Sequence, residues 1–344
     1  MAVAELMSPA VAPAAKEPLV EIKGLTVQFV SREATVSAVN GVSLSIAPGE
    51  VLCIIGESGS GKSVTMRALM RLLPPQARIS GSLRVAGQDV LALNRRGLSD
   101  LRGSTISMIF QEPMTALDPV YTIGHQIAET VIRHDKCRRA EARARALELL
   151  TLVRIPSPER RLDAYPHELS GGLRQRAMIA MSLSCRPRLL LADEPTTALD
   201  ATVQIQALIL LRNLQRQMGM SMIFVTHDLG VAAQIADRVA VMYAGRIVET
   251  GAVRDVLLDP VHPYTRGMLA STVHGQARDQ DIAAIPGSPP DLRRLPPGCS
   301  FAPRCGHATV DCFTTLPPEV ALPSGRMARC FIPARRPLEQ ATGS

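Results

Sequence analysis

The chain has 344 residues and a net charge of +7, with 46% hydrophobic and 20% charged residues. This length predicts about two domains, and the composition excludes a disordered or collagen-like chain. No apolar run reaches the roughly 18 residues that a membrane-spanning helix needs, so we expect the chain not to cross a bilayer alone. With no tryptophan, four tyrosines and six phenylalanines, the chain has little material for base stacking, and we expect no nucleic acid as a partner.

The first 18 residues carry Glu5 and three prolines and lack a basic leader. They predict a flexible extension of a cytosolic protein and not a signal peptide. Residues 20–29 and 43–46 partly alternate apolar and polar side chains, which predicts two strands of an antiparallel sheet. Short apolar runs then alternate with helical segments, and this order predicts a buried, mostly parallel sheet with helices on its faces. These runs are residues 51–55, 106–110, 189–192, 222–225 and 239–243.

Strand signals disappear between Pro113 and Ser170. Within that stretch, residues 138–153 place apolar side chains at helical intervals, so the region is predicted to be a helical insertion. After about residue 265 the composition changes, with ten prolines between Pro286 and Pro333 and four of the seven cysteines. This last part is predicted to be a separate, loop-rich unit.

A glycine-rich motif, GESGSGKS, follows the predicted strand at 51–55 and stands where a helix should begin. Gly56, Gly59 and Gly61 allow backbone amides to surround anionic oxygens. Lys62 is expected to reach the outer phosphates, and the Ser63 hydroxyl to bind Mg²⁺. A plain glycine-rich turn is the weaker alternative, and the motif predicts a nucleoside triphosphate site.

A pair of acidic residues ends the predicted strand LLLADE. Asp193 follows four apolar residues and is a candidate Mg²⁺ ligand. Glu194 is a candidate general base for an attacking water, a role that contributes about 10²- to 10⁴-fold in rate. Adjacent acids at a strand end are also typical of a helix N-cap, but the upstream phosphate loop favours the metal site.

The sequence LSGGLRQR, residues 169–176, precedes the apolar run AMIAMSL. Ser170 is expected to be the N-cap of a helix. An ordinary capped helix explains the pattern, but a capped glycine pair is also a second anion-binding terminus. Two such termini in one chain suggest a composite phosphate site.

Together these motifs resemble the ATP-binding subunits of ATP-binding cassette (ABC) transporters. The resemblance covers residues from about 20 to 335. It rests on an ordered set of residues: the loop GESGSGKS, Gln111, the signature LSGG, Asp193 and Glu194, the triplet Ala198, Leu199 and Asp200, and His227.

The resemblance implies an α/β fold with a P-loop NTPase (RecA-like) core and a mostly parallel sheet. An antiparallel β subdomain and a helical subdomain at about 113–170 complete a nucleotide-binding domain over residues 19–265. A C-terminal extension rich in cysteine and proline is expected over residues 266–344, and the flexible N-terminal extension over residues 1–18.

The resemblance further implies that two cassettes dimerise head to tail, with the P-loop of one and the signature of the other enclosing each ATP. Gln111 is implied to contact Mg²⁺ and the membrane partner, His227 the γ-phosphate, and Asp200 the dimer interface. Phe29 is our candidate for stacking on adenine, with core packing as the alternative. The implied ATP-binding residues are Phe29, Gly56, Glu57, Ser58, Gly59, Ser60, Gly61, Lys62, Ser63, Val64, Gln111, Ser170, Gly171, Gly172 and Asp200. The implied Mg²⁺ ligands are Ser63, Gln111 and Asp193, and the implied catalytic residues are Glu194 and His227.

A narrower resemblance is to the ATPases of dipeptide, oligopeptide and nickel importers. It rests on FQEPMTALDPVYTIGHQI, HPYTRGML and PGSPP, at residues 110–127, 262–269 and 286–290. It implies the ATP-hydrolysing subunit of a peptide importer, lying at the cytoplasmic face of the inner membrane. The implied partners are a second ATPase subunit, identical or different, two transmembrane permease subunits and an extracytoplasmic substrate-binding protein. A soluble ABC switch without a permease, and an importer of nickel or another small solute, are the alternatives.

Four cysteines of the extension, Cys299, Cys305, Cys312 and Cys330, lack the C-x-x-C spacing of common zinc sites. Disulfides are unfavourable in a cytosolic chain, so thiolates in a proline-rich loop favour zinc or an iron-sulfur cluster over inert buried thiols. The segment CSFAPRC resembles the element that holds a [4Fe-4S] cluster in some peptide-importer subunits, which puts the cluster ahead of zinc. The remaining cysteines are expected to act as small hydrophobes.

Overall fold

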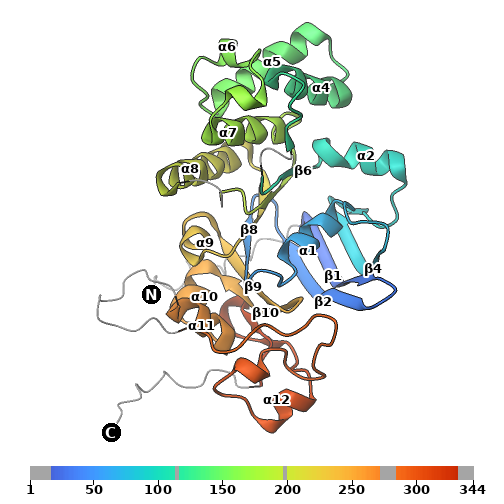
Figure 1. The fold of residues 1–344 in the computed structure, drawn as a ribbon, viewed down its shortest axis with the longest axis vertical. Helices are drawn as coiled ribbons and strands as arrows, with labels where there is room; N and C mark the ends of the chain where they lie inside the picture. The colour runs from blue at the N-terminus through green and yellow to red at the C-terminus, as the bar shows by residue number, and fades with distance from the viewer. Residues whose placement is uncertain (1–16, 113–115, 197–199, 272–283, 332–344) are drawn as a thin grey trace, which may run out of the picture.

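The computed structural model describes residues 17–112, 116–196, 200–271 and 284–331. Almost all of the N-terminal extension therefore lies outside the described residues, as do Ala198 and Leu199 of the motif that precedes Asp200. The described chain forms two sheets, a helical lobe between two strands of the larger sheet, and a C-terminal lobe (Figure 1). The α/β fold expected from the sequence is confirmed, with both its antiparallel and its parallel sheet.

The smaller sheet is antiparallel and has the order β2-β1-β4-β5. Its central strand β1 pairs with both neighbours, so that Val20 lies opposite Ile46 on one side and Val85 on the other. Because side chains alternate along a strand, one face of β1 is buried and the other is more open. The strands are β1 (Val20–Val30), β2 (Thr35–Ile46), β4 (Ala77–Val85) and β5 (Gln88–Asp89).

The larger sheet has the order β11-β12-β10-β9-β3-β8-β7-β6. Strands β9, β3, β8, β7 and β6 are parallel, whereas β10, β12 and β11 continue the sheet in antiparallel pairing. All five apolar runs predicted as strands are found in the parallel part. The strands are β3 (Val51–Ile55), β6 (Ile106–Ile109), β7 (Leu189–Asp193), β8 (Ser221–Thr226), β9 (Arg238–Tyr243), β10 (Arg246–Ala252), β11 (Val320–Ala321) and β12 (Met327–Ala328).

Strand β3 separates two hydrophobic cores because its side chains alternate between the two faces of the sheet. Leu52 and Ile54 join the core shared with the antiparallel sheet and α1, whereas Val51, Cys53 and Ile55 join the core on the opposite face. Burial on both faces is typical of a parallel sheet covered by helices. Around it lie α1 (Lys62–Leu69), α2 (Arg95–Ser104), α8 (Ala201–Met218), α9 (Leu229–Ile235), α10 (Val253–Leu258) and α11 (Pro263–Ala270).

The helical lobe is inserted between β6 and β7 and stands at the top of Figure 1. Its main helix spans residues 139–152, close to the predicted 138–153, and it buries Ala142, Ala146, Leu149 and Leu150. The elements of this lobe are α4 (Ile123–Asp135), α5 (Arg139–Leu152), α6 (Pro158–Arg161), η1 (Pro166–Glu168) and α7 (Gly171–Ser182).

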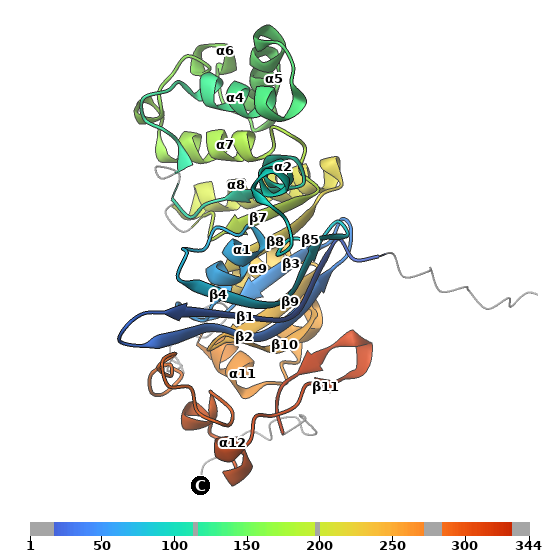
Figure 2. The same cartoon turned by 90° about the vertical axis from the view of Figure 1, so that its right-hand side faces the viewer.

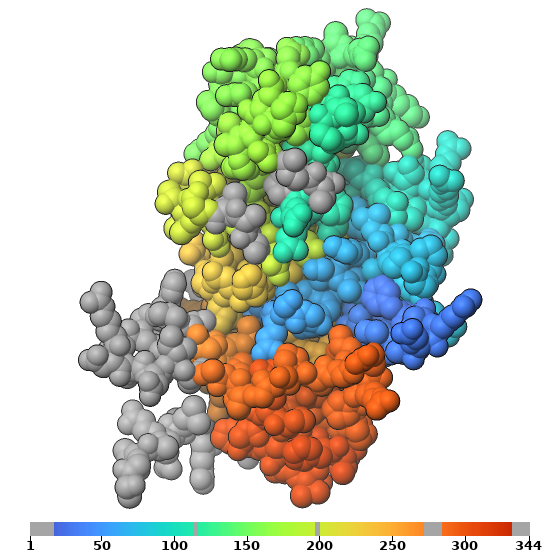
Figure 3. Space-filling model, viewed as in Figure 1, coloured from blue at the N-terminus to red at the C-terminus, as the bar shows by residue number. Residues whose placement is uncertain are grey.

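The C-terminal extension is rich in loops but is joined to the larger sheet (Figure 2). In β12, Met327 pairs with Thr250 of β10 and Ala328 pairs with Glu249. Figure 3 shows the extension, orange to red, as a lower lobe against the body of the molecule. Its other short elements are η2 (Ala302–Arg304), α12 (Val310–Thr314) and η3 (Pro323–Gly325). Across the described ranges, we find no helix that combines the length and the apolar character needed to cross a membrane.

Candidate functional site

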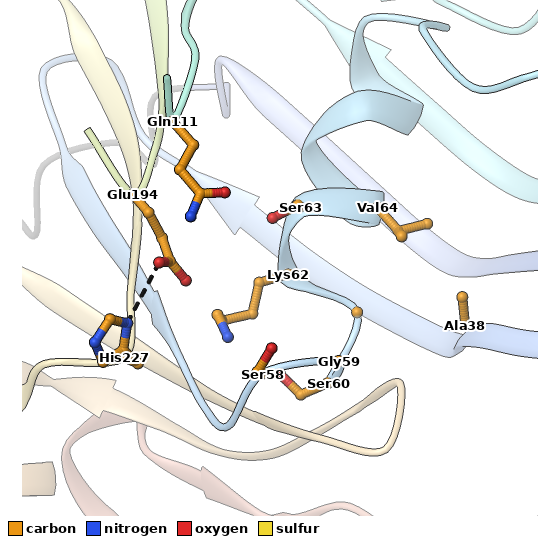
Figure 4. Close-up of a pocket in the computed structure, with 11 residues that line it drawn as sticks. Ala38, Ser58, Gly59, Ser60, Lys62, Ser63, Val64, Gln111, Glu194 and His227 are labelled. Carbon is orange, nitrogen blue, oxygen red and sulfur yellow. Dashed lines mark ion pairs between the residues drawn. The ribbon is translucent and has the colours of Figure 1, made fainter. Parts of the chain in front are cut away.

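A cavity of about 500 Å³ opens above the glycine-rich loop, at the carboxyl ends of the parallel strands. Ligands of open α/β sheets bind at this edge of the sheet. Figure 4 shows that the lining side chains come from the loop, from α1 and from the ends of neighbouring strands. The lining residues are Ala38, Ser58, Gly59, Ser60, Gly61, Lys62, Ser63, Val64, Gln111, Glu194 and His227.

The loop is folded around the side chain of Lys62, which is buried. Lys62 Nζ donates hydrogen bonds to the carbonyl oxygens of Gly56, at 2.7 Å, and Glu57, at 2.9 Å. Gly61 has φ +104°, and a Cβ there would collide with the Ala38 carbonyl, so only glycine fits. Ser60 Oγ is buried without a hydrogen-bond partner, so the loop offers an unsatisfied donor together with an ammonium group. A glycine-rich loop with an unsatisfied donor and an ammonium group is suited to bind an anion.

Ser63, which lines the cavity, is hydrogen-bonded to the buried Asp193 at the end of β7. Ser63 Oγ donates a 2.7 Å hydrogen bond to Asp193 Oδ1. Burial raises the pKa of Asp193, although the hydrogen bond from Ser63 opposes this. A hydroxyl and a carboxylate are hard oxygen ligands of the kind that Mg²⁺ accepts, beside waters and substrate phosphates. The donor set therefore fits Mg²⁺.

Glu194 and His227 lie next to each other on one side of the cavity (Figure 4). His227 Nδ1 lies 3.3 Å from Glu194 Oε2, and the Glu194 side chain is 16% exposed against 57% for His227. Glu194 has φ +44°, a left-handed conformation that is uncommon outside glycine and is frequent at functional sites. Gln111 follows β6, Glu194 follows β7 and His227 follows β8. Because these three strands are neighbours in the sheet, the three polar side chains line the same cavity.

Several residues expected to bind ATP lie outside this cavity. Phe29 is partly buried and packs against the core of the antiparallel sheet, so its role in adenine stacking stays a prediction. Ser170 caps α7 by accepting the Leu173 N–H at 3.4 Å. Asp200 caps α8 by accepting the Val203 N–H at 3.0 Å. The helix-cap interpretation of Ser170 is thus correct for the single chain.

The described chain also contains contacts to the loop that the sequence analysis missed. Glu57 does not line the cavity, and its carboxylate is bound by Arg304 of the extension at 2.9 and 3.1 Å. Tyr264 Oη accepts the Glu57 N–H at 2.9 Å. In the sequence, the only signal for these two residues is that Arg304 lies in CSFAPRC and Tyr264 in HPYTRGML, the segments that carry the resemblance to peptide importers. Motif membership alone does not reveal a contact across more than 200 residues.

Cys299, Cys305 and Cys312 of the extension are free thiols in the structure. The Cys299 N–H donates to the Cys312 carbonyl oxygen at 2.7 Å. Burial raises the pKa of Cys299, and the neighbouring Cys330 and Cys312 contribute to this shift. Among the residues that the structure describes, however, no three His, Cys, Asp or Glu side chains are grouped to hold a metal ion. The arrangement therefore gives the expected cluster or zinc site no support.

Comparisons with known proteins agree with this geometry. Residues 39–197 match the sequence family described as ABC transporter, and residues 248–312 match the oligopeptide/dipeptide transporter C-terminal region. The oligopeptide transport ATP-binding protein OppD of Salmonella typhimurium is 48% identical over 322 residues, covering 94% of this chain and 96% of that protein. A putative peptide import ATP-binding protein of Brucella melitensis is 48% identical over 329 residues, covering 92% and 97%.

A solved structure is also similar. It is a dimeric ATP-binding cassette in a post-hydrolysis state bound to ADP and Pi. It aligns with a TM-score of 0.62 and 30% identity, covering 68% of this chain and 99% of that one.

Proposed function

The chain belongs to the ABC transporter ATPases of the oligopeptide/dipeptide type, and on that premise we propose that it drives the import of peptides by hydrolysing ATP. The observation that carries the proposal is the joining, in one chain, of a phosphate cavity with the C-terminal region of peptide transporters. The relatives named above are designated oligopeptide or peptide import proteins. Peptide is therefore favoured over nickel or another small solute as the cargo.

The roles that we propose for the site residues are supported by their positions. The loop amides and Lys62 bind the phosphates, and Val64 and Ser58 line the same cavity. Ser63 and Asp193, with Gln111, hold Mg²⁺. Glu194 orients and deprotonates the attacking water, while His227, beside it, contacts the γ-phosphate. In phosphoryl transfer the protein contributes mainly positioning and charge neutralisation, and these residues supply both.

The signature residues Ser170, Gly171 and Gly172 serve a second cassette. They form the N-terminal end of α7 and are not among the residues that line the cavity of their own chain. A helix N-terminus with open backbone amides is suited to bind phosphate. A head-to-tail dimer places this end of one cassette over the ATP of the other, with Asp200 at the interface.

The assembled importer consists of this subunit, a second ATPase subunit, two transmembrane permeases and an extracytoplasmic substrate-binding protein. In that assembly the chain lies at the cytoplasmic face of the membrane, where it is held by binding to the permeases. We include no nucleic acid among its partners.

The test is purification of the assembly from its native membrane, followed by ATPase assays with and without the binding protein and peptides of different lengths. We expect permeases to co-purify and peptide to stimulate hydrolysis. Stimulation by nickel and not by peptide would show that the transported solute is nickel. Full ATPase activity of the chain with no membrane partner would favour a soluble switch.

A metal in the extension is a further part of the proposal. Its support is the close approach of Cys299 and Cys312 and the resemblance of CSFAPRC to a cluster-binding element. No step of hydrolysis is assigned to it, since three ligands are not gathered among the described residues. Iron, zinc and acid-labile sulfide analysis of anaerobically purified protein tests it, and metal-free protein with full activity would reject it.

A further inference from the structure

An arginine of the C-terminal extension binds the glutamate of the phosphate-binding loop. Arg304 donates from both terminal nitrogens to the two carboxylate oxygens of Glu57, at 2.9 and 3.1 Å. The Arg304 side chain is 6% exposed and that of Glu57 is 28% exposed. A bidentate pair with this burial is stronger and more directional than a surface ion pair, and it joins residues 247 positions apart.

The backbone of Glu57 is held as firmly as its side chain. Tyr264 Oη accepts the Glu57 N–H, and the Glu57 carbonyl accepts a hydrogen bond from Lys62 Nζ, both at 2.9 Å. Every polar group of Glu57 is therefore engaged, one of them by the lysine proposed to bind the phosphates. A displacement of Glu57 would change the position of the lysine and of the adjoining loop amides.

Arg304 is itself fixed by the extension and by the body of the protein. Its Nε donates to the Pro286 carbonyl at 2.9 Å, and one terminal nitrogen donates to Tyr243 Oη at 3.2 Å. The guanidinium carbon lies 5.8 Å from the ring centre of Tyr243 and 5.9 Å from that of Phe301, within cation–π range. Tyr243, Tyr264 and Phe301 also pack against one another.

This cluster is conspicuous in a chain with only four tyrosines and six phenylalanines. It joins β9, α11 and the extension, and it gives Arg304 one defined position. Although burial opposes it, the hydrogen bonds to Glu57 and Tyr243 raise the pKa of Arg304, so the arginine is a permanent cation.

We propose that Arg304 is a positioning residue of the nucleotide site, through which the C-terminal extension sets the affinity of the loop for the triphosphate. It acts in two ways: it holds Glu57 away from the cavity, and it neutralises the only carboxylate within the loop GESGSGKS. Without the arginine, an uncompensated negative charge would stand beside the phosphates and repel them. The triphosphate itself never touches Arg304.

The test measures binding of a fluorescent ATP analogue to the purified full chain, with Arg304→Gln, Glu57→Gln and the double variant. We expect Arg304→Gln to weaken binding by about tenfold, the scale of one charged hydrogen-bonded pair. Glu57→Gln alone should bind no more weakly than the unaltered chain, because Arg304 already offsets the carboxylate there, and its removal leaves only the Arg304 cation near the phosphates. The double variant should recover to within about threefold of the unaltered chain.

The rescue separates this role from a purely structural one. If Arg304 only stabilises the extension, the double variant will bind no better than Arg304→Gln. Arg293→Gln is the matched control, since Arg293 lies in the same extension and pairs with Asp291 in an exposed bridge, and it should leave affinity unchanged. Thermal unfolding checks that each variant is folded, and Arg304→Met, which removes the charge but keeps an unbranched chain against Tyr243 and Phe301, replaces Arg304→Gln if the latter is not.

Unchanged affinity in Arg304→Gln, or failure of Glu57→Gln to rescue it, would overturn the proposal. The assay requires no permease, binding protein or peptide. Its outcome is therefore independent of whether the assembly imports peptides.

Discussion

Ser63 Oγ and Asp193 Oδ1 are joined by a 2.7 Å hydrogen bond although 130 positions separate the two residues in the chain. The bond brings the first turn of α1 against the carboxyl end of β7. Each residue carries an oxygen suited to Mg²⁺. The two proposed ligands are thus already together before any nucleotide binds, so little of the binding energy of Mg²⁺-ATP is spent on assembling them.

We expect Ser63→Ala to raise the Mg²⁺ concentration needed for half-maximal ATPase activity by about tenfold or more. The substitution removes one ligand and leaves Asp193, whose pKa burial already raises, without its hydrogen-bond donor. The measurement is a Mg²⁺ titration at fixed ATP. Ser99→Ala on α2 is the control, and an unchanged Mg²⁺ requirement in Ser63→Ala would remove Ser63 from the metal site.

Glu194→Gln should keep ATP binding and lower the hydrolysis rate by about 10²- to 10⁴-fold. The amide occupies the same space but cannot accept a proton from water, and the contact with His227 Nδ1 at 3.3 Å changes little. Single-turnover hydrolysis in the assembled complex measures the chemical step. Glu148→Gln, an exposed carboxylate on α5, is the control. Near-normal turnover of Glu194→Gln would reject its proposed role.

Local patterns predicted the parallel strands well because their side chains are buried on both faces and form continuous apolar runs, as in β3 and β7. Strand β4 was missed because its residues, ARISGSLRV, are half polar and exposed. The short strands β11 and β12 were missed for another reason. Each has only two residues, too few to show an alternation of apolar and polar side chains, and each is a strand only through its pairing, β12 with β10 and β11 with β12.

The candidate site likewise contains residues that local sequence identifies and residues that it does not. The glycine-rich loop, Asp193 and Glu194 follow from local sequence because phosphate and metal binding constrain adjacent residues. For Phe29 the sequence leaves both interpretations open, since an aromatic residue on a strand can stack on a base or pack against a core, and in the structure it packs against the core of the antiparallel sheet. Arg304 was not found because its partner Glu57 is remote in sequence, and the pair is created by tertiary packing alone.

Gly171→Ala tests the proposed dimer without disturbing the single chain. A Cβ on Gly171 meets no atom within 4 Å, and alanine in a helix is more stable than glycine by roughly 0.5–1 kcal/mol. We therefore expect unchanged or slightly higher thermal stability. If the ATP of a second cassette lies over this helix end, the added methyl group will overpack the contact and lower ATPase activity by about tenfold.

Gly306→Ala provides the control for that variant. Gly306 also has open space around its Cβ position but lies in the extension. Sedimentation with ATP in the Glu194→Gln background reports dimerisation directly. Unaltered ATP-dependent dimerisation and hydrolysis in Gly171→Ala would contradict a signature that closes over the nucleotide of the partner.

The buried imidazole of His262 makes the fold sensitive to acid. Burial lowers the pKa of His262 to about 3, and its Nδ1 accepts the Tyr264 N–H at the start of α11. In the unfolded chain the imidazole titrates near about pH 6.5. Between these two values the unfolded state binds a proton that the folded state does not. The free energy of unfolding should therefore fall as the pH drops below about 6.5, by about 1.4 kcal/mol per pH unit from this residue.

His262→Asn removes the titratable imidazole and keeps a side-chain hydrogen-bond acceptor at the N-cap of α11. Asparagine is smaller, so the variant is expected to be less stable at neutral pH, and the informative quantity is the slope against pH. Urea unfolding between about pH 7 and pH 5 should give a slope smaller by about one proton in the variant. Equal slopes for the two proteins would show that His262 does not carry this sensitivity. Because Tyr264 also binds the Glu57 N–H, protonation of His262 would disturb the same contact that fixes the phosphate loop.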